Sequence, residues 1–385
     1  MKKTIKRFVK NNTLLMFLYR LFGNLSLSII KPFLRTDDKL ILFVSYGGRY
    51  YNDSPKYMYE YMKKDPRFAD YKLVWAFTDP GRHSDIENRI TIDSFKYYKT
   101  ALKARCWITN VVVERGLDFK GINTFYFHTT HVTLPKYCGY DSQEPELTAV
   151  GFRYHYDVSC AQSQYEKELQ YSMFGLKESQ VIVCGYPKND RIANSSASEY
   201  YQLRQRIGIP EGKKAILYAP TFRGCMDAAA EVNIDFRLWQ QELGDDYVLL
   251  FRAHPVLVDK LDLTPYAPFV INTTSYPDNV DLMIAADILV SDYSGIFFEF
   301  GVQDKPMYAF AYDYDEYIKS RQLYVDIKHE IPGGDLSEKE LVSLIKSGLT
   351  DEMKAKLLAF RNKYIAEYGS ATPKAVDVIY ENITR

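Results

Sequence analysis

Short apolar runs alternate with helical stretches along most of the chain, and this alternation constrains the fold more than any other feature. Nine runs have the length and composition of buried strands: Leu40–Val44, Lys72–Phe77, Cys106–Val112, Thr124–Phe127, Val181–Cys184, Ala215–Tyr218, Tyr247–Phe251, Ile288–Val290 and Met307–Phe310. Stretches with helical periodicity lie between them: Pro55–Lys64, Ser94–Lys103, Gln162–Met173, Val280–Ala285, Ser294–Val302 and Leu336–Lys346. Strands that alternate with helices form parallel sheets covered on both faces. The sequence therefore predicts an α/β protein.

The alternation occurs twice, before and after about residue 180, in a chain of 385 residues. Two Rossmann-like, doubly wound domains that face a cleft are the economical architecture for this pattern. We expect a basic segment at 1–36, one domain at 37–178, a second at 179–350, and helices at 351–385 that pack across the domains. Ligands of such sheets bind beyond the carboxyl ends of the strands, so the chemistry should lie on the loops that follow them.

The formal net charge is zero, which argues against a general nucleic-acid binder. Residues 1–36, however, contain eight basic residues and no acidic one, together with apolar residues at helical spacing. Such a helix can lie on an anionic membrane surface, while the alternative is a helix packed on its own domain. Arg20, Asn24 and Lys31 interrupt its apolar run, which argues against a membrane-crossing helix.

The titratable residues give little sign of a metal or a disulfide framework. The five cysteines are odd in number and contain no CxxC pair, which favours a reducing, cytoplasmic compartment. His128 and His131 are three residues apart, but no third ligand has suitable spacing. We therefore expect neither a metal nor another cofactor.

The polar turn after Ile288–Val290 is the strongest local signal for a ligand site. Ser291 and Asp292 end the strand, and Ser294, Gly295 and Ile296 open an apolar helix. The free N–H groups at a helix start can hold a phosphate, although the same pattern also fits an ordinary helix cap.

Other polar side chains follow strands in the second half. For each of them, a structural role is the alternative to ligand binding: a structural histidine, a surface cation or a turn residue. The candidates for binding an anionic donor are Lys188, Asn189, Thr221, Arg223, Arg252 and His254.

Several blocks together resemble the CDP-glycerol glycerophosphotransferase family of teichoic acid synthesis. They are ILYAPTFRG (216–224), CGYPKNDRI (184–192), FRAHP (251–255), DLMIAADILVSDYSGIFFEF (281–300), KPMYAFAYDYDEY (305–317), IPGG (331–334), SYGGRYYNDSPKYMYEYM (45–62) and YKLVWAFTDP (71–80). The resemblance implies a GT-B-like fold. It also implies transfer of a polyol phosphate from CDP-glycerol or CDP-ribitol to a lipid-linked saccharide at the cytoplasmic membrane face.

The resemblance also implies roles for individual residues. The family usually carries a Trp-His-Gly-Thr-Pro-Leu-Lys-like segment, whose histidine is matched by His131 and whose lysine is matched by Lys136, with Thr133 between them on the acceptor side. Thr130 and Val132 depart from it, standing where Trp and Gly are usual. His131 would be the general base, and His254 with Arg223 and Arg252 would stabilise the diphosphate.

Three questions stay open at this point. The chain's size favours a primase-type member over a polymerase, and a homo-oligomer is neither indicated nor excluded. A GT-B nucleotide-sugar glycosyltransferase that acts on a lipid-linked acceptor is the enzymatic alternative, since fold alone does not separate the two reactions. A membrane scaffold that has lost catalysis is the non-enzymatic alternative.

Overall fold

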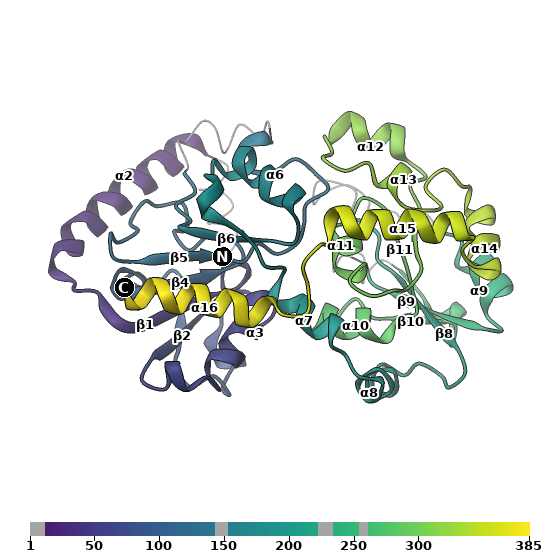
Figure 1. Cartoon of the computed structure of the whole chain (residues 1–385), viewed down its shortest axis with the longest axis horizontal. Helices are drawn as coiled ribbons and strands as arrows, with labels where there is room; N and C mark the ends of the chain where they lie inside the picture. Colours follow the sequence, from purple (N-terminus) through teal and green to yellow (C-terminus); the bar gives the residue numbers. More distant parts are fainter. Residues whose placement is uncertain (1–11, 143–152, 222–233, 254–260) are drawn as a thin grey trace.

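Two parallel sheets with helices on both faces form the molecule (Figure 1). The structure is a computed structural model, and it describes residues 12–142, 153–221, 234–253 and 261–385. The expected α/β class is confirmed.

The first sheet has seven strands in the order β3-β2-β1-β4-β5-β6-β7, all of them parallel. Its strands are β1 (Asp37–Val44), β2 (Lys72–Phe77), β3 (Arg89–Thr91), β4 (Ala104–Thr109), β5 (Phe125–His128), β6 (Val158–Ala161) and β7 (Val181–Val183). Its helices are α2 (Thr13–Ile30), α3 (Asp53–Met62), α4 (Phe95–Lys103) and α6 (Gln164–Phe174).

The second sheet has five parallel strands in the order β10-β9-β8-β11-β12. They are β8 (Lys214–Tyr218), β9 (Tyr247–Phe251), β10 (Val270–Asn272), β11 (Ile288–Ser291) and β12 (Met307–Ala309). The helices around it are α7 (Pro187–Ala193), α8 (Ala197–Ile207), α9 (Phe236–Leu243), α10 (Asn279–Ala285), α11 (Ile296–Phe300), α12 (Tyr314–Ser320), α13 (Ile327–Glu330) and α14 (Glu338–Ser347).

The strand order reverses once in each sheet, between β1 and β4 in the first and between β8 and β11 in the second. Loops on the two sides of such a reversal run in opposite directions and leave a crevice at the carboxyl ends of the strands. The loops after β1, β4, β8 and β11 are therefore among those positioned to bind ligands.

All nine strands expected from apolar runs are present, with ends shifted by up to three residues. Sequence inspection missed β3, β6 and β10, which have three or four residues each and are too short for a periodic signal. The strand β7 pairs with β6 and completes the first sheet, although its residues were assigned to the second half of the chain. We propose that the first domain runs to β7 and that the second begins at α7.

The last two helices, α15 (Asp351–Tyr364) and α16 (Ala371–Thr384), cross from one sheet to the other (Figure 1). Leu357, Phe360 and Tyr364 of α15 belong to the core of the second sheet. Val376 and Ile379 of α16 belong to the core of the first sheet. The chain segment between these helices therefore ties the two halves together.

Gly185 lies beneath this crossing and should be sensitive to any side chain. Its φ is +85°, and an added Cβ would lie 2.6 Å from the carbonyl oxygen of Glu367, between α15 and α16. Gly208 has the same φ, with no atom within 4 Å of an added Cβ. Gly208→Ala should lower the free energy of unfolding by about 1–2 kcal/mol only, which is the cost of a left-handed backbone conformation for a residue with a Cβ.

We expect Gly185→Ala to lower the free energy of unfolding by about 1–3 kcal/mol more than Gly208→Ala does, because backbone atoms cannot move aside as side chains do. Urea unfolding of the two variants measures the difference. Equal losses would show that the crossing adjusts without strain.

Candidate active site

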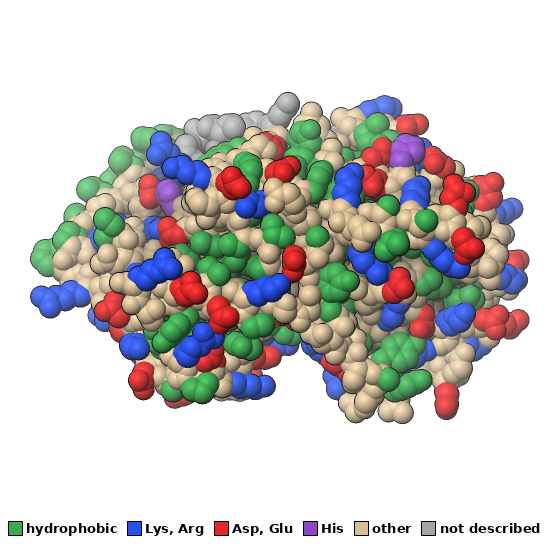
Figure 2. Space-filling view, in the orientation of Figure 1, with side chains coloured by type: hydrophobic (Ala, Val, Ile, Leu, Met, Phe, Trp, Pro, Cys, Tyr) green, Lys and Arg blue, Asp and Glu red, His purple; other side chains and the backbone are tan. Residues whose placement is uncertain are grey.

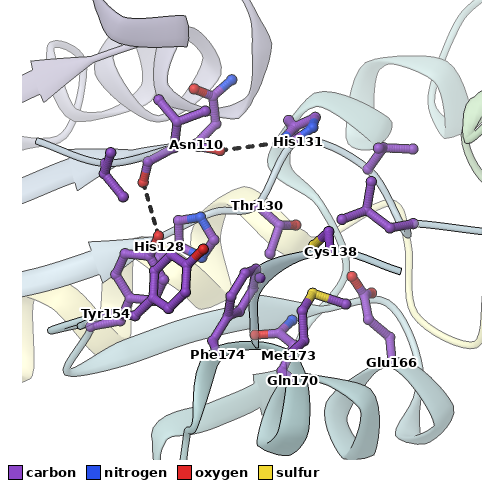
Figure 3. Close-up of a pocket in the computed structure, with 16 residues that line it drawn as sticks. Asn110, His128, Thr130, His131, Cys138, Tyr154, Glu166, Gln170, Met173 and Phe174 are labelled. Carbon is purple, nitrogen blue, oxygen red and sulfur yellow. Dashed lines mark hydrogen bonds between the residues drawn. The ribbon is translucent and has the colours of Figure 1, made fainter. Parts of the chain in front are cut away.

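His131 lies on the loop after β5, at the carboxyl edge of the first sheet (Figure 3). Its Nδ1 is 3.3 Å from the carbonyl oxygen of Asn110. A carbonyl only accepts, so Nδ1 carries the proton in this contact and Nε2 keeps its lone pair. Burial lowers the pKa of His131, although the nearby Asp53 carboxylate opposes this change. The ring is therefore neutral at neutral pH and is suited to accept a proton at Nε2.

The turn after β11 is fixed by the two residues that end the strand. Ser291 donates from its Oγ to the carbonyl oxygen of Ala219 at 2.6 Å. The carboxylate of Asp292 accepts from the backbone N–H of Thr221 at 2.9 Å and of Tyr293 at 2.6 Å. These bonds join the loop after β8 to the loop after β11 across the reversal point of the second sheet.

Ser294, Gly295 and Ile296 complete this segment, and we call residues 294–296 the donor turn. Ser294 Oγ accepts from the backbone N–H of Ile296 at 3.3 Å. The helix α11 begins at Ile296 and ends at Phe300, so it is shorter than the predicted Ser294–Val302. A helix of five residues has a small dipole, so an anion at this turn would depend mainly on the backbone N–H groups of Ser294 and Gly295.

The loop that carries His131 touches the donor turn directly. A Cβ added to Gly295 would overlap Cγ2 of Val132 and lie 3.1 Å from the carbonyl oxygen of Thr133. The structure thus brings together two regions that the sequence separates by about 160 residues. The loop that carries His131 on the first sheet and the turn after β11 on the second meet in one place.

A buried ionic cluster lies behind this contact. Lys188 Nζ donates to Asp53 Oδ2 at 3.1 Å, to Glu299 Oε1 at 2.7 Å and to the carbonyl oxygen of His131. Burial alone would lower the pKa of Lys188, but the two carboxylates raise it above its ordinary value. Burial raises the pKa of Glu299, against the effect of Lys188. All three ammonium protons of Lys188 are used, so its predicted contact with a donor stays a prediction.

A second buried network holds Thr133 and Asn189. Thr133 Oγ1 donates to Glu166 Oε2 at 3.2 Å and accepts from Gln162 Nε2 at 2.9 Å. Asn189 Nδ2 donates to Gln162 Oε1 at 2.7 Å. Burial raises the pKa of Glu166 to about 7, which makes it a carboxyl group that titrates near neutrality. Ligand contacts of Thr133 and Asn189 likewise stay predictions.

Two predicted cations lie at the edge of the site. The guanidinium of Arg252 donates to the carbonyl oxygens of Thr273 and Tyr276, both at 2.6 Å, and burial lowers its pKa. Lys136 Nζ lies 5.5 Å from the centre of the Tyr317 ring. The predicted donor-binding residues Arg223 and His254 lie outside the described residues.

A pocket of about 230 Å³ opens beside His131 in the first half (Figure 3). Aromatic side chains of Tyr154, Tyr156 and Phe174 line one side of it. Gln170 lies at its floor, and its Oε1 is buried with no hydrogen-bond partner. An aromatic wall with an unsatisfied polar group suits a ring or chain that carries hydroxyl groups.

No group of three or more His, Cys, Asp or Glu side chains is arranged to hold a metal ion in the part of the chain that the structure describes. The neutral His131 ring beside the turn after β11 would suit general-base chemistry on a phosphate-bearing substrate.

Comparison with known proteins identifies the family. The CDP-glycerol:poly(glycerophosphate) glycerophosphotransferases match residues 26–381. The chain belongs to this family. The assignment made from the sequence blocks is confirmed.

Curated relatives of this family act in teichoic acid synthesis. The chain is 31% identical to a teichoic acid poly(glycerol phosphate) polymerase of Staphylococcus epidermidis, over 90% of this chain and 51% of the relative. It is 28% identical to a teichoic acid glycerol-phosphate transferase of Staphylococcus aureus, over 99% of this chain and 100% of the relative. The chain therefore spans about half the length of the polymerase and the whole of the transferase.

Solved structures of the family confirm the GT-B-like fold. A His→Asn variant of the wall teichoic acid polymerase TagF, soaked with CDPG, superposes with a TM-score of 0.84 and 28% identity, over 99% of this chain and 98% of that chain. A TagF structure with a His→Ala substitution superposes with a TM-score of 0.82 over the same shares. A Staphylococcus aureus MnaA–UDP structure, at 13% identity and a TM-score of 0.55, shares the fold alone.

Sequence inspection gave no role to Asp53, Glu299, Glu166 and Tyr186, which the structure places at the site. A signal existed for Glu299, because it is the single charge in the apolar run Ile296–Phe300, and buried carboxylates need a partner. For the other three, no local pattern names the partner.

The contact between Gly295 and Val132 predicts energetic coupling. Gly295→Ala should lower the free energy of unfolding by about 1–3 kcal/mol, because the new methyl group needs the space of Val132. Val132→Ala removes the overlapping Cγ atoms, so it should recover part of that loss in the double variant, with a coupling energy of about 1 kcal/mol. A double-mutant cycle by urea unfolding measures it. Additive losses would mean that the two loops do not press on each other in solution.

Proposed function

We propose that this chain transfers glycerol phosphate from CDP-glycerol to a hydroxyl group of a lipid-linked saccharide in teichoic acid synthesis, with release of CMP. The observation that carries the proposal is the contact between the His131 loop and the donor turn, in a chain that aligns with TagF over almost its whole length.

In the proposed reaction, the acceptor hydroxyl attacks the phosphorus that bears glycerol. A new oxygen–phosphorus bond forms, the bond from that phosphorus to CMP breaks, and the hydroxyl proton passes to Nε2 of His131. Phosphoryl transfer depends mainly on positioning and on stabilisation of the oxygens around phosphorus. The donor side would consist of Thr221, Ser291, Asp292, Ser294, Gly295, Ile296 and Arg252, with Arg223 and His254 on adjoining segments.

Within the donor set, Ser291 and Asp292 shape the turn, since their side chains already bond to the chain. The backbone N–H groups of Ser294 and Gly295 would meet the diphosphate. The acceptor would enter the pocket beside His131, with its reactive hydroxyl directed at Nε2. Lys136 stays a proposed acceptor-side residue.

Addition of one or few units, as by a primase, is our preferred form of the reaction. The end-to-end match with the Staphylococcus aureus glycerol-phosphate transferase supports it. CDP-ribitol is the second candidate donor, because a poly(ribitol-phosphate) polymerase of Bacillus spizizenii is 33% identical over 45% of this chain.

Release of CMP tests the function. With a lipid-linked saccharide acceptor, CDP-glycerol should give CMP and a product longer by glycerol phosphate, CDP-ribitol should give less, and UDP-sugars should give no UDP. Mass spectrometry of the lipid product counts the units added. Sugar transfer from a UDP-sugar would replace the proposal with a glycosyltransferase.

His131→Gln is the matched active-site variant. It should lower CMP release about 100-fold or more, since general-base catalysis contributes about 10²–10⁴-fold, while CDP-glycerol binding stays near wild type. His329→Gln, at an exposed histidine on α13, is the control. Because the pKa of His131 is lowered, wild-type kcat/KM should begin to fall only below about pH 6.5. Wild-type turnover in His131→Gln would remove the base assignment.

The helix α2 gives a reason to place the protein on the cytoplasmic face of the membrane. Polar groups attach it to the first domain: Asn24 Oδ1 accepts from the N–H of Asp118 at 2.8 Å, and Lys31 Nζ donates to the carbonyl oxygen of Lys120 at 2.8 Å. Leu27 packs into the core of the first domain, whereas other apolar side chains of the helix and of the turn after it are at least half exposed: Leu14, Phe17, Leu21, Phe22, Leu25, Ile29 and Phe33. Figure 2 shows hydrophobic side chains along this edge of the molecule.

Exposed apolar patches of this kind mark interaction sites, and basic residues flank this one in the sequence. By length and composition the segment Leu14–Phe33 is able to cross a membrane, which is weak evidence by itself. Its bonds to the loop at residues 115–120 favour a helix that lies in the membrane surface. We therefore propose peripheral attachment to anionic lipid.

Two sets of substitutions separate the apolar and the charged parts of this attachment. Leu21→Gln, Phe22→Gln and Leu25→Gln together should lower binding to anionic vesicles about tenfold or more at any salt concentration, because each buried apolar side chain contributes about 1.5–3 kcal/mol. Gln at Lys2, Lys3, Lys6, Arg7 and Lys10 should lower binding at low salt only, because salt screens the charges.

Leu358→Gln changes an equally exposed leucine on α15 and is the control for the apolar set. Vesicle co-sedimentation measures all three variants. Binding that is equal on neutral and anionic vesicles, and unaffected by either set, would exclude α2 as the membrane-binding element.

A further inference from the structure

The ionic cluster around Lys188 has no role in the chemistry proposed above, yet burying its charges costs free energy. Its three side chains are at most 10% exposed. Removing charges from water costs several kcal/mol for each ion, and apolar replacements of buried ion pairs are often no less stable. Stability alone is therefore a weak explanation for this cluster.

The cluster joins four segments of the site. Asp53 begins α3, Lys188 lies on α7, Glu299 lies on α11 directly after the donor turn, and the fourth partner is the carbonyl oxygen of His131. One ammonium group thus fixes the distance between the backbone of His131 and the helix that follows the donor turn.

Backbone strain gathers at the same place. Five described residues other than glycine have positive φ, and three of them lie around His131: Tyr46 (φ 45°), Asp53 (φ 63°) and Thr130 (φ 51°). Tyr46 donates from its hydroxyl to Asp53 Oδ2 at 2.8 Å, and its ring lies 5.7 Å from the ring of His131. Such conformations persist only where the surroundings impose them, and they cluster at functional sites.

The cluster also sets the charges that act on the His131 imidazole. Asp53 on α3 favours its protonated form, and Lys188 on α7 disfavours it. The neighbouring titratable groups are Tyr46, His128 at the end of β5, which burial and His131 keep neutral with a pKa of about 3, and Glu299, which acts through Lys188. Removing the positive or the negative member should therefore move the titration of His131 in opposite directions.

We propose that Asp53, Lys188 and Glu299 are positioning residues, which hold the His131 loop in register with the donor turn and set the balance of charge that acts on the imidazole. This role rests on the proposed function for its kinetic consequence only. It replaces direct donor contact as the role of Lys188.

The test compares Lys188→Met, Lys188→Arg, Asp53→Asn and Glu299→Gln with wild type, after circular dichroism has verified folding. The pKa of His131 is measured by NMR on protein with labelled histidine, with the signal assigned from His131→Gln. It should rise in Lys188→Met, fall in Asp53→Asn and stay close to wild type in Lys188→Arg, which keeps the charge.

Kinetics supply the second readout. Lys188→Met and Glu299→Gln should lower kcat about tenfold to 100-fold, as expected from a small misplacement of the base, while KM for CDP-glycerol stays within about twofold. Lys188→Arg should restore part of kcat. The acidic limb of the pH profile of kcat/KM should move with the NMR value.

Each outcome decides something. A His131 pKa that is the same in Lys188→Met and Asp53→Asn overturns the proposal, and so does a large rise in KM for CDP-glycerol with kcat unchanged, since Lys188 would then bind the donor. If the wild-type chain turns over no CDP-polyol, the proposed function fails, but the opposite NMR shifts still support the positioning role. If Lys188→Met does not fold, Lys188→Arg and the isosteric Asp53→Asn and Glu299→Gln carry the same comparison.

Discussion

The contact between the His131 loop and the donor turn is the constraint on which the rest of the site depends. Val132 lies against Gly295, so the loop that carries His131 on one sheet and the turn after β11 on the other are held against each other. Parallel sheets make this possible, because each places its loops at the carboxyl ends of its strands. Two such edges that face each other bring residues from distant parts of the chain into one small volume. Once proximity is fixed in this way, phosphoryl transfer requires few specialised side chains.

The short block Cys184–Ile192 shows how one motif serves several structural purposes. Gly185 leaves room for the crossing between α15 and α16, and Asp190 accepts from the N–H groups of Ala371 and Thr372 at the start of α16. Lys188 enters the ionic cluster, and Asn189 enters the network of Gln162. The motif therefore joins both sheets and the last helix. A block of this kind is identified from the sequence as a whole, because the sequence does not show the separate role of each residue in it.

The sequence predicted the fold well, because buried parallel strands are apolar runs that local composition reveals. The loops that it assigned to a site do follow strands, and the structure brings the loop after β5 into contact with the turn after β11. The sequence could not predict pairing: the partners of Lys188, Asp53 and Glu299, lie more than 100 residues away, so the ionic cluster was not expected, and donor contact by Lys188 stays a prediction. The sequence did not predict the length of α11 or the orientation of α2 for the same reason. Each is decided by what packs against the element, and the apolar pattern of α2 does not say which face meets the protein.

The orientation of α2 has a consequence for the proposed reaction. Leu27 of α2 packs into the core of the first domain and Asn24 and Lys31 bond to that domain, whereas Leu14, Phe17, Leu21, Phe22, Leu25 and Ile29 stay exposed. The same first domain carries His131 and the pocket beside it. If α2 lies in the membrane surface, the base and the acceptor pocket are held at a fixed height above the lipid, because sheet and helix move as one body. A lipid-linked saccharide would then meet His131 by diffusion in two dimensions, while the soluble donor arrives on the other sheet. On the proposed function, the sheet that carries the helix would serve the acceptor, and the other sheet would serve the donor.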